Sequence, residues 1–285
     1  MFDFSCNGIY SKLVSLDDTA TADDVVDRIA SLVDEAIAKT GIDKGRVIGM
    51  GVAAPGKVAV EDGIVIYYGK IDGLVNYHLK EALEKRTGLD VHVHNNCSAM
   101  AYGLYNDRGS AAGSIFTFLL RSGVTGSLVD SNGIYIASDG TTLEAGHIIV
   151  KPDGLPCTCG MCGCLQAQLL DLDSRYCDGG QQGRCLFENL PSGEEGEKLI
   201  GEICDYLYVA VKDIQRFSSP ESFLIICSSV FTAERIAEKL RLRLESEKDF
   251  FTPKAPNVKA VGYDTSLALK GAMELVLSGF FNDTL

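Results

Sequence analysis

The sequence is short of basic residues and lacks both long apolar runs and a recognisable export signal. It has 26 Lys and Arg against 39 Asp and Glu among 285 residues, which gives a formal net charge of −13. Because nucleic-acid affinity comes largely from Lys and Arg that neutralise phosphates, this balance argues against direct contact with DNA or RNA. No apolar run approaches the roughly 18 residues that cross a bilayer, and no basic start precedes an apolar stretch. We therefore expect a cytoplasmic protein that contacts neither nucleic acid nor membrane.

The stretch from residue 144 to residue 166 concentrates two acids, one histidine and four cysteines. A set of three thiolates and one imidazole is available in His147, Cys157, Cys159 and Cys164. Zn²⁺ binds such ligands tetrahedrally and leaves no open position for chemistry, so the set predicts a structural metal. Glu144 lies three residues before His147, and a helical or turn-like segment would direct both side chains into the same cavity. One loop is thus predicted to hold a zinc ion beside a ligand.

Other uses of the cysteines remain open at this point. In an oxidising compartment the ten cysteines could form disulfides, although the missing export signal argues against this. Cys159 and Cys162 also have the Cys-x-x-Cys spacing of a redox pair. As a spare thiol, Cys162 could also exchange with a neighbouring cysteine as a metal ligand.

These residues carry a family resemblance. Glu-x-Gly-His from Glu144, followed by Cys-x-Cys-Gly-x-x-Gly-Cys-Leu from Cys157, resembles the signature of the ROK family, which contains bacterial sugar kinases and sugar-responsive transcriptional repressors. The resemblance implies that Glu144 and His147 contact sugar hydroxyls, that the His and three Cys residues bind zinc, and that the protein is a homodimer. The family signature usually ends Cys-Leu-Glu, whereas this chain has Gln166 as the candidate sugar contact there.

A second candidate sugar contact follows a predicted strand over residues 91–94, whose alternation places His92 and His94 at the surface. The strand delivers Asn95 and Asn96 to its carboxyl end, where ligands collect in open α/β sheets. This segment resembles the family's Asn-Asp-Ala-Asn-Ala-Ala, whose Asp takes the proton from the sugar hydroxyl. Asn96 stands at that position, and an amide cannot act as a base. The alternative interpretation is a pair of helix N-caps.

Three further segments resemble nucleotide-binding elements of the family but lack their glycines. Residues 2–16 are predicted to form two short strands around a turn. The segment lies where the family has an Asp-x-Gly-Gly-Thr-Lys loop, of which this chain keeps only Asp3. Side chains therefore stand where bare glycine backbone would approach phosphate. In the second phosphate loop only Gly123 and Gly126 remain, and a glycine-poor turn is the competing interpretation. Ser228 and Ser229 replace the glycine pair beside the adenine. Asp3, Gly123 and Gly126 are the remaining candidates for binding Mg-ATP.

Strand and helix patterns alternate through both halves of the chain, which predicts an α/β protein. The resemblance implies two actin-like (ribonuclease H-like) lobes with a ligand cleft between them. The first lobe is expected to span 1–107, with the helix 265–285 returning to it. The second is expected to span 108–264 and to carry the zinc-binding loop 144–166, with the junction near residues 107–109.

The leading functional hypothesis is a ROK-family sugar-binding protein that has lost phosphotransfer and works as a sensor, resembling the effector domain of sugar-responsive repressors. The departures at Asn96 and in the three nucleotide elements all affect ATP or proton transfer, while the predicted sugar and zinc residues remain. Family repressors have a winged helix before this region, so a regulator would need a DNA-binding partner or an upstream segment. The alternatives are an active glucokinase-like, ATP-dependent hexose or N-acetyl amino sugar kinase, and a structural subunit that binds neither ligand.

Overall fold

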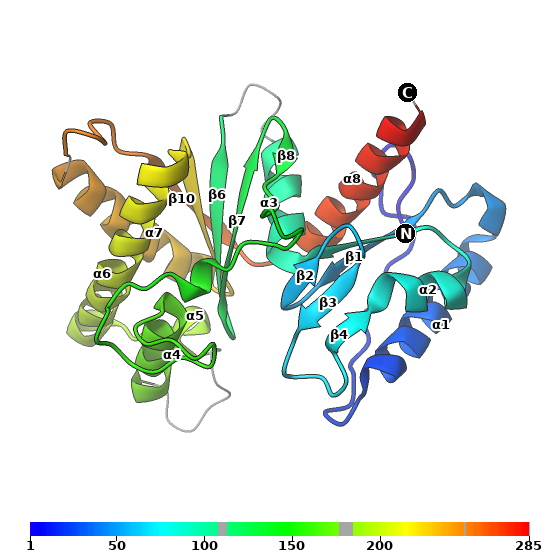
Figure 1. Cartoon of the computed structure of the whole chain (residues 1–285), viewed down its shortest axis with the longest axis horizontal. Coiled ribbons are helices and arrows are strands. Elements are labelled where there is room, and N and C mark those ends of the chain that lie inside the picture. The colour runs from blue at the N-terminus through cyan, green and yellow to red at the C-terminus, as the bar shows by residue number, and fades with distance from the viewer. Residues whose placement is uncertain (108–112, 177–184, 248, 285) are drawn as a thin grey trace. The chain divides into compact units, whose positions relative to one another are not determined.

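The computed structural model describes residues 1–107, 113–176, 185–247 and 249–284 (Figure 1). The chain divides into two compact units. Unit 1 consists of Met1–Asp107, Ile136–Thr142 and Thr265–Leu285, and unit 2 consists of Arg108–Tyr135 and Leu143–Asp264. The junction predicted near residues 107–109 extends outside the described residues. Among the described residues, no helix has both the length and the apolar character that a bilayer crossing requires.

The segment Ile136–Thr142 belongs to unit 1, whereas the sequence-based boundaries place it in the second lobe. Two backbone hydrogen bonds explain the difference. The amide of Val60 donates to Gly140 O at 3.0 Å, and the amide of Thr142 donates to Val58 O at 3.1 Å. Pairing of this kind joins residues about 80 positions apart and leaves no mark on local hydrophobic periodicity.

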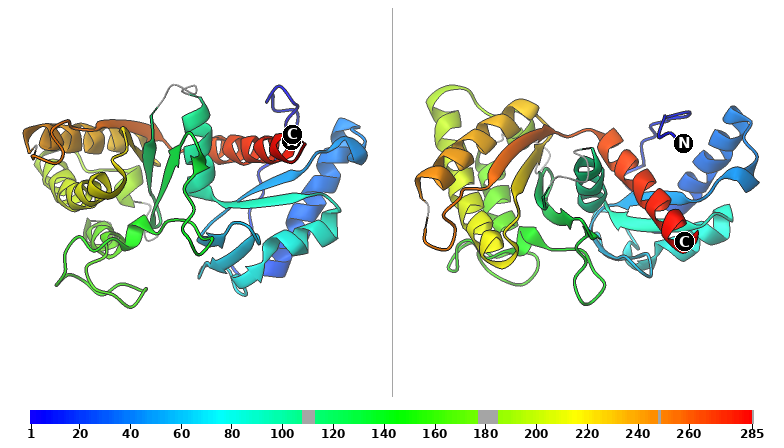
Figure 2. Two further views of the ribbon diagram at one scale, coloured as in Figure 1. Left: turned by 45° about the horizontal axis from the view of Figure 1, so that its top comes forward. Right: turned by 90° about the horizontal axis from the view of Figure 1, so that it is seen from above.

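Unit 1 contains two small sheets and four α-helices. One sheet pairs β1 (Met50–Ala54) in parallel with β5 (Val91–Asn95), and the other has the antiparallel order β2 (Lys57–Ala59), β3 (Ile64–Tyr67), β4 (Val75–His78). A 3₁₀ turn, η1, covers Lys44–Arg46, and the helices are α1 (Ala22–Thr40), α2 (Leu79–Thr87), α3 (Asn96–Asn106) and α8 (Thr265–Thr284). Helices α1 and α2 lie on one side of β1 and β5, and α8 lies on the other (Figures 1 and 2).

The two strands predicted between residues 2 and 16 do not form, and this prediction is wrong. The segment has one isolated bridge, between Phe2 and Gly8. The carboxylate of Asp3 instead accepts hydrogen bonds from the backbone amides of Ser5 and Asn7, each at 2.9 Å. Such local side-chain bonds compete with a strand ladder. In the described part of the chain, β1 consequently pairs with β5 alone.

His94 is half-buried and its Nδ1 atom fully buried within unit 1, which corrects the expectation that it lies at the surface. Burial, and secondarily the neighbouring His92, lowers the pKa of His94 to about 4. Its Nδ1 atom is buried and has no hydrogen-bond partner within the described residues. His92 is the more exposed of the two and lies 2.9 Å from Asp90. The alternation along β5 is therefore buried on one face and only half-buried on the other.

This burial predicts a pH dependence of stability. Between the ordinary histidine pKa of about 6.5 and the lowered pKa of about 4, His94 is protonated in the unfolded chain but neutral in the folded protein. The free energy of unfolding should therefore fall as the pH drops through this range. The loss at pH 4 approaches about 3 kcal/mol by linkage. Urea unfolding between pH 7 and pH 4 should show a shallower fall in His94→Gln than in the wild type, whereas His92→Gln should keep most of the wild-type fall, because His92 is only the secondary cause of the low His94 pKa. Identical slopes in all three proteins would contradict the assignment.

Unit 2 is built on a five-stranded sheet with the order β10-β9-β6-β7-β8. Its strands are β6 (Ile115–Leu120), β7 (Val124–Asp130), β8 (Gly133–Ile134), β9 (Ser222–Cys227) and β10 (Asn257–Gly262). Strands β6, β9 and β10 are parallel, and β7 and β8 continue the sheet antiparallel. The helical elements are η2 (Ala145–His147), α4 (Leu165–Tyr176), α5 (Cys185–Glu188), α6 (Gly193–Ser218) and α7 (Val230–Ser246).

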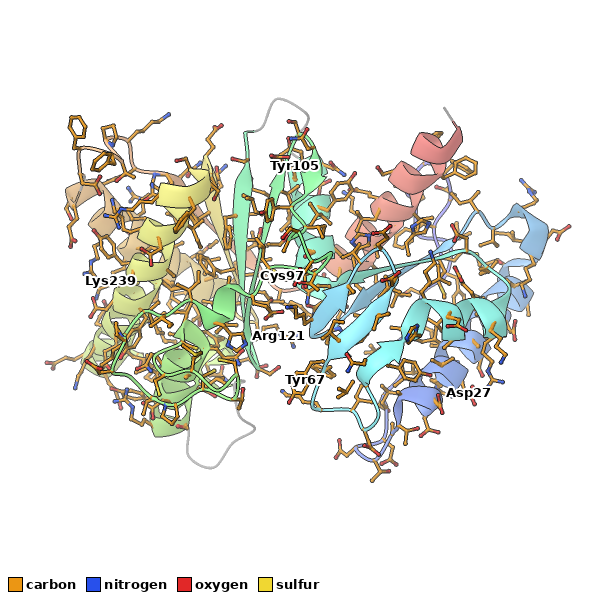
Figure 3. The ribbon with its side chains drawn as sticks, viewed as in Figure 1. Asp27, Tyr67, Cys97, Tyr105, Arg121 and Lys239 are labelled. Atoms are coloured by element: carbon orange, nitrogen blue, oxygen red, sulfur yellow. The ribbon has the colours of Figure 1, made fainter. Side chains whose placement is uncertain are left out.

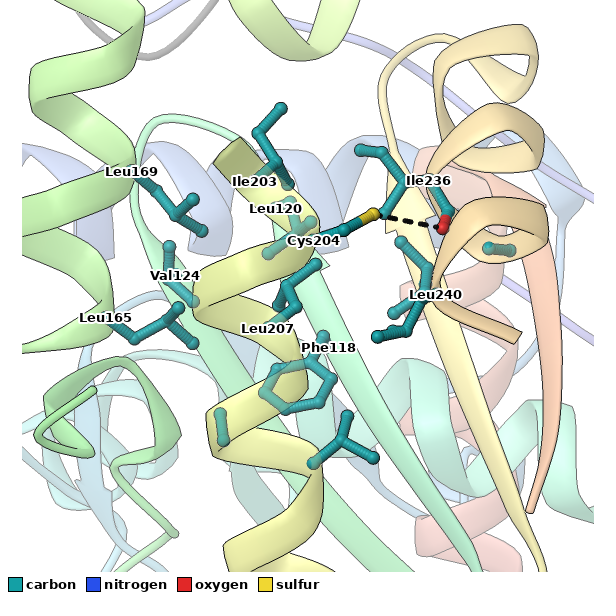
Figure 4. Close-up of a cluster of buried hydrophobic side chains, with 14 of the residues drawn as sticks. Phe118, Leu120, Val124, Leu165, Leu169, Ile203, Cys204, Leu207, Ile236 and Leu240 are labelled. Carbon is teal, nitrogen blue, oxygen red and sulfur yellow. Dashed lines mark hydrogen bonds between the residues drawn. The ribbon is translucent and has the colours of Figure 1, made fainter. Parts of the chain in front are cut away.

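The core of unit 2 forms where helices α4, α6 and α7 pack on the sheet. Phe118 of β6, Leu207 of α6 and Leu240 of α7 have no exposed surface (Figure 4). Cys204 also lies in this cluster, and its thiol donates to Ile236 O at 3.6 Å. Every residue of β6 and β9 is buried, as expected for parallel strands covered on both faces. This rigid layer supports the strand ends and the metal-ligand loop.

Candidate functional site

The histidine and three cysteines singled out in the sequence come together in unit 2. One ligand atom from each of His147, Cys157, Cys159 and Cys164 lies within 4.8 Å of all the others. Cys157 Sγ is 3.5 Å from His147 Nδ1, and Cys159 Sγ is 3.6 Å from Cys164 Sγ. Tetrahedral coordination with metal bonds of about 2.0–2.3 Å places ligand atoms roughly 3.3–3.8 Å apart. The four residues therefore fit a single tetrahedral metal ion.

The loop that carries the cysteines is held by its own backbone. Val150 and Lys151 both donate to Gly163 O, at 2.9 and 3.2 Å, and Gly163 in turn donates to Leu155 O at 2.8 Å. Gly163 has φ 78°, and a Cβ there would lie 1.7 Å from Lys151 O. Glycine is thus required beside Cys164, and the crossing backbone brings that ligand back towards His147.

The protonation of the thiols fits a cation site. A hydrogen bond from the Met161 amide leads the effects that lower the pKa of Cys159, whereas burial, followed by the neighbouring thiols, raises the pKa of Cys164 to about 12. A buried, crowded thiol is not ionised by its protein surroundings alone. A bound divalent cation reverses this preference and displaces the thiol protons, so the cluster is suited to a cation.

Glu144 and His147 lie at the two ends of one 3₁₀ turn, η2, as the three-residue spacing predicts. Glu144 Oε2 is 3.9 Å from His147 Nε2, on the side of the ring opposite Nδ1. When Nδ1 is held in the cluster, Nε2 carries the ring proton and becomes a donor of fixed direction. Both side chains are partly exposed. A carboxylate acceptor and an imidazole donor therefore lie side by side.

Close packing on β7 sets the position of this turn. A Cβ on Gly146 would lie 2.1 Å from Val124 O, and a Cβ on Gly126 would lie 2.7 Å from Ala145 Cβ. Gly126 stands within β7 itself, where it makes room for η2 rather than forming a loop. Glycine is therefore required at position 126 because η2 packs against it. The sequence alone could not distinguish this reason from phosphate binding.

Gln166 and Gly123 meet where β7 begins, at the same end as η2. Gln166 lies in the first turn of α4, and its Oε1 accepts a hydrogen bond from the Val124 amide at 3.1 Å. A Cβ on Gly123 would lie 3.2 Å from the same oxygen. The Arg121 amide donates to Gly123 O at 3.0 Å and closes a tight turn. Gln166 thus ties α4 to this turn.

A cluster at the carboxyl ends of the parallel strands was not found from the sequence. Arg121 follows β6, Ser228 follows β9 and Tyr263 follows β10. The Arg121 guanidinium carbon lies 3.7 Å from the centre of the Tyr263 ring, and Arg121 Nε donates to Ser228 Oγ at 3.3 Å. Figure 3 labels Arg121 at this end of the sheet. The sequence signal for this cluster was Arg121, an arginine directly after a buried strand. Its contacts with Ser228 and Tyr263 could not be predicted, because they depend on the order of the strands in the sheet.

In unit 1, Asn95 and Asn96 take different positions. Asn95 is the N-cap of α3, where its Oδ1 accepts from the amides of Cys97 and Ser98 at 2.8 and 3.3 Å. Its Nδ2 donates to Gly56 O at 2.6 Å, and the residue is 4% exposed. The N-cap interpretation therefore holds for Asn95. Asn96 is the first residue of α3 and is only half-buried. It is the more accessible of the two for a ligand.

The chain thus has two α/β units, one of which carries the His-Cys₃ loop. The model of the ROK family matches residues 5–278, and the chain belongs to this family. Its resemblance to a glucokinase of Streptomyces griseus, solved with glucose and AMPPNP, has a TM-score of 0.72 at 24% identity and covers 92% of this chain and 90% of that one. The solved structure of a ROK-family transcriptional regulator, a homologue of Escherichia coli Mlc, matches with a TM-score of 0.72 at 20% identity. The match covers 91% of this chain and 69% of that one. These findings confirm the family and the fold inferred from the sequence.

Curated relatives include both kinases and repressors. A glucokinase of Halalkalibacterium halodurans is 33% identical over 144 residues, which are 50% of this chain and 43% of that protein. The DNA-binding transcriptional repressor Mlc of Escherichia coli is 30% identical over 163 residues, which are 55% of this chain and 40% of that protein. The matched part of the chain thus spans less than half the length of either relative.

Proposed function

We propose that the chain is a sugar-binding protein with impaired phosphotransfer that acts as a sugar sensor, as a cytoplasmic homodimer. One observation carries the proposal. The Glu144–His147 pair is present and oriented on the metal-ligand cluster, while residue 96 has an amide where a kinase of this family needs a carboxylate. Binding groups are retained and the proton acceptor is lost.

The sugar-binding half of the proposal rests on donor and acceptor chemistry. The Glu144 carboxylate can accept hydrogen bonds from two hydroxyls, and His147 Nε2 can donate to a third oxygen. Because the ligand set has one nitrogen and three sulfurs, we assign the ion to zinc, which holds the imidazole in position without taking part in chemistry. Gln166 and Asn96 are the further proposed contacts.

Side chains at the carboxyl edge of the unit 2 sheet support the loss of phosphotransfer. Arg121 lies over Tyr263 and bonds Ser228, which brings side chains close to strand ends that usually receive ligands. Ser229 is occupied as the N-cap of α7 and accepts from the Thr232 amide at 3.3 Å. Asp3, Gly123 and Gly126 remain the candidates for nucleotide contacts, and each is already engaged in a turn or in packing.

The second candidate function is an active, glucokinase-like kinase for hexoses or N-acetyl amino sugars with Mg-ATP. The 33% identity to a glucokinase favours it. In that case another group would have to accept the proton from the sugar hydroxyl. Loss of a general base typically lowers a rate about 10²- to 10⁴-fold, which separates the two candidates experimentally.

We expect the wild type to bind a sugar without phosphorylating it. Calorimetry against a panel of hexoses and N-acetyl amino sugars, run beside a coupled assay with Mg-ATP, measures both quantities on the same preparation. Asn96→Asp restores a carboxylate, and it too should show no turnover if the nucleotide elements have also failed. Turnover by Asn96→Asp alone would show that only the base is missing. Turnover by the wild type would contradict the sensor and support the kinase.

A further inference from the structure

Three segments of unit 1 meet where β1 and β5 have their carboxyl ends. Asn95, the last residue of β5, donates from Nδ2 to Gly56 O at 2.6 Å. Gly56 lies in the turn between β1 and β2, and a Cβ on it would lie 2.1 Å from Tyr67 O. Tyr67 is the last residue of β3, and Asn96 begins α3 directly after Asn95. Tyr67 therefore lies at the same end of unit 1 as the proposed sugar contact Asn96.

The side chain of Tyr67 is exposed and yet held in place. The residue is 59% exposed (Figure 3). Its hydroxyl end packs against the backbone of Gly69, where a Cβ would lie 2.6 Å from Tyr67 Oη. The pairing of β2 with β3 shifts register between Lys57 and Val58, and Lys57 is the partner of Tyr67. Irregularities of this kind redirect side chains and are common beside active sites. Local packing thus sets the direction of an exposed aromatic ring.

This ring offers an apolar face that the protein itself does not use. Within the described residues, Tyr67 has no aromatic or cationic partner. The face of an aromatic ring is electron-rich and attracts the positive edges of polarised C–H groups. A pyranose has hydroxyls around its rim and C–H groups on its faces, so it is bound best by polar groups beside it and an apolar surface beneath it. The Asn96 amide can supply the first and the Tyr67 ring the second.

We propose that Tyr67 is a stacking platform for a pyranose ring, which makes the ligand a cyclic sugar with an apolar C–H face. The inference rests on the proposed function, because it takes Asn96 as a sugar contact. A side chain that is held in position before the ligand arrives loses little freedom on binding, so the stack contributes to affinity. Hydrogen bonds reach the hydroxyls of a sugar and of its open-chain alditol, whereas only the cyclic form presents a rigid C–H face. Tyr67 therefore favours the cyclic form.

The first test is calorimetry of the full chain with glucose, galactose, mannose and their N-acetylated amino sugars. For each sugar that binds, Tyr67→Ala should weaken the affinity at least fivefold, whereas Tyr67→Phe keeps the ring and should stay within twofold of the wild type. Gly69→Ala places a methyl group where the ring lies and should also weaken binding. Tyr135 is a matched control, because it is 53% exposed in unit 2, and Tyr135→Ala should keep the wild-type affinity.

The outcomes separate this inference from the function on which it rests. Sugar binding by the wild type that Tyr67→Ala leaves unchanged would overturn the platform and leave the sugar-binding function intact. Failure of the wild type to bind any sugar of the panel would overturn both.

A second test detects the stack directly by fluorescence. The chain contains no tryptophan, so Tyr67→Trp places its only indole at the proposed platform. The tightest-binding sugar of the panel should shift the emission to shorter wavelength and reduce quenching by acrylamide, with the Kd that calorimetry gives for the same variant. Tyr135→Trp should show neither change. An emission that stays constant while calorimetry shows the sugar bound, or an equal shift with the alditol of that sugar, would overturn the proposal.

Discussion

Replacing Cys164 with serine should remove the bound zinc and lower the midpoint of thermal unfolding by about 5–10 °C. The thiol of Cys164 is fully buried and lies 3.6 Å from Cys159 Sγ. A metal that binds only the folded ligand set contributes its binding free energy to folding, so loss of one ligand lowers both metal affinity and stability. Metal content by mass spectrometry and scanning calorimetry with and without EDTA measure the two effects.

Cys162→Ser is the matched control for this prediction. Cys162 is exposed, lies two positions away in the same loop and is not part of the four-ligand cluster. Its serine variant should keep the metal and the wild-type midpoint. If Cys162→Ser lost the metal while Cys164→Ser kept it, Cys162 would replace Cys164 in the ligand set.

Replacing Glu144 with glutamine should weaken sugar binding about 10- to 150-fold, the range expected when a hydrogen bond to a charged group is lost. The metal content should not change, because His147 keeps its Nδ1 in the cluster while only the group beside Nε2 changes. Calorimetry with the tightest-binding sugar of the panel measures the effect.

Asp153→Asn removes the same charge from an exposed position in the same loop and serves as the control for Glu144→Gln. It should leave sugar affinity at the wild-type value. Equal loss in the two variants would show a general effect of loop charge, and unchanged affinity in Glu144→Gln would remove Glu144 from the proposed sugar site.

The parts of the site that depend on short spacing could be predicted from the sequence. His147 is three positions after Glu144, and one turn of 3₁₀ helix suffices to bring them together. The cysteines lie within eight residues of one another, so a compact loop joins them without help from distant segments. Their side-chain chemistry indicates the type of metal, and both facts are local.

Residues that depend on distant partners could not be placed in this way. Residues 2–16 have a strand-like pattern, yet the Asp3 carboxylate takes the amides that a ladder would use. Asn95 and Asn96 are chemically identical neighbours, and the contact of Asn95 with the distant Gly56 helps to separate the buried cap from the accessible residue. Glycine at 126 is required by η2 packing, which no spacing along the chain reports.

By itself the sequence determined the α/β class, the family and the four residues of the candidate metal site, because these follow from local periodicity and from chemistry at short spacing. Only the tertiary structure decided which way the imidazole of His147 faces and that Arg121 stacks on Tyr263. Each of these depends on strand order or on contacts between segments far apart in the chain. Local propensity does not specify such contacts, since they arise only when the sheets and helices have packed.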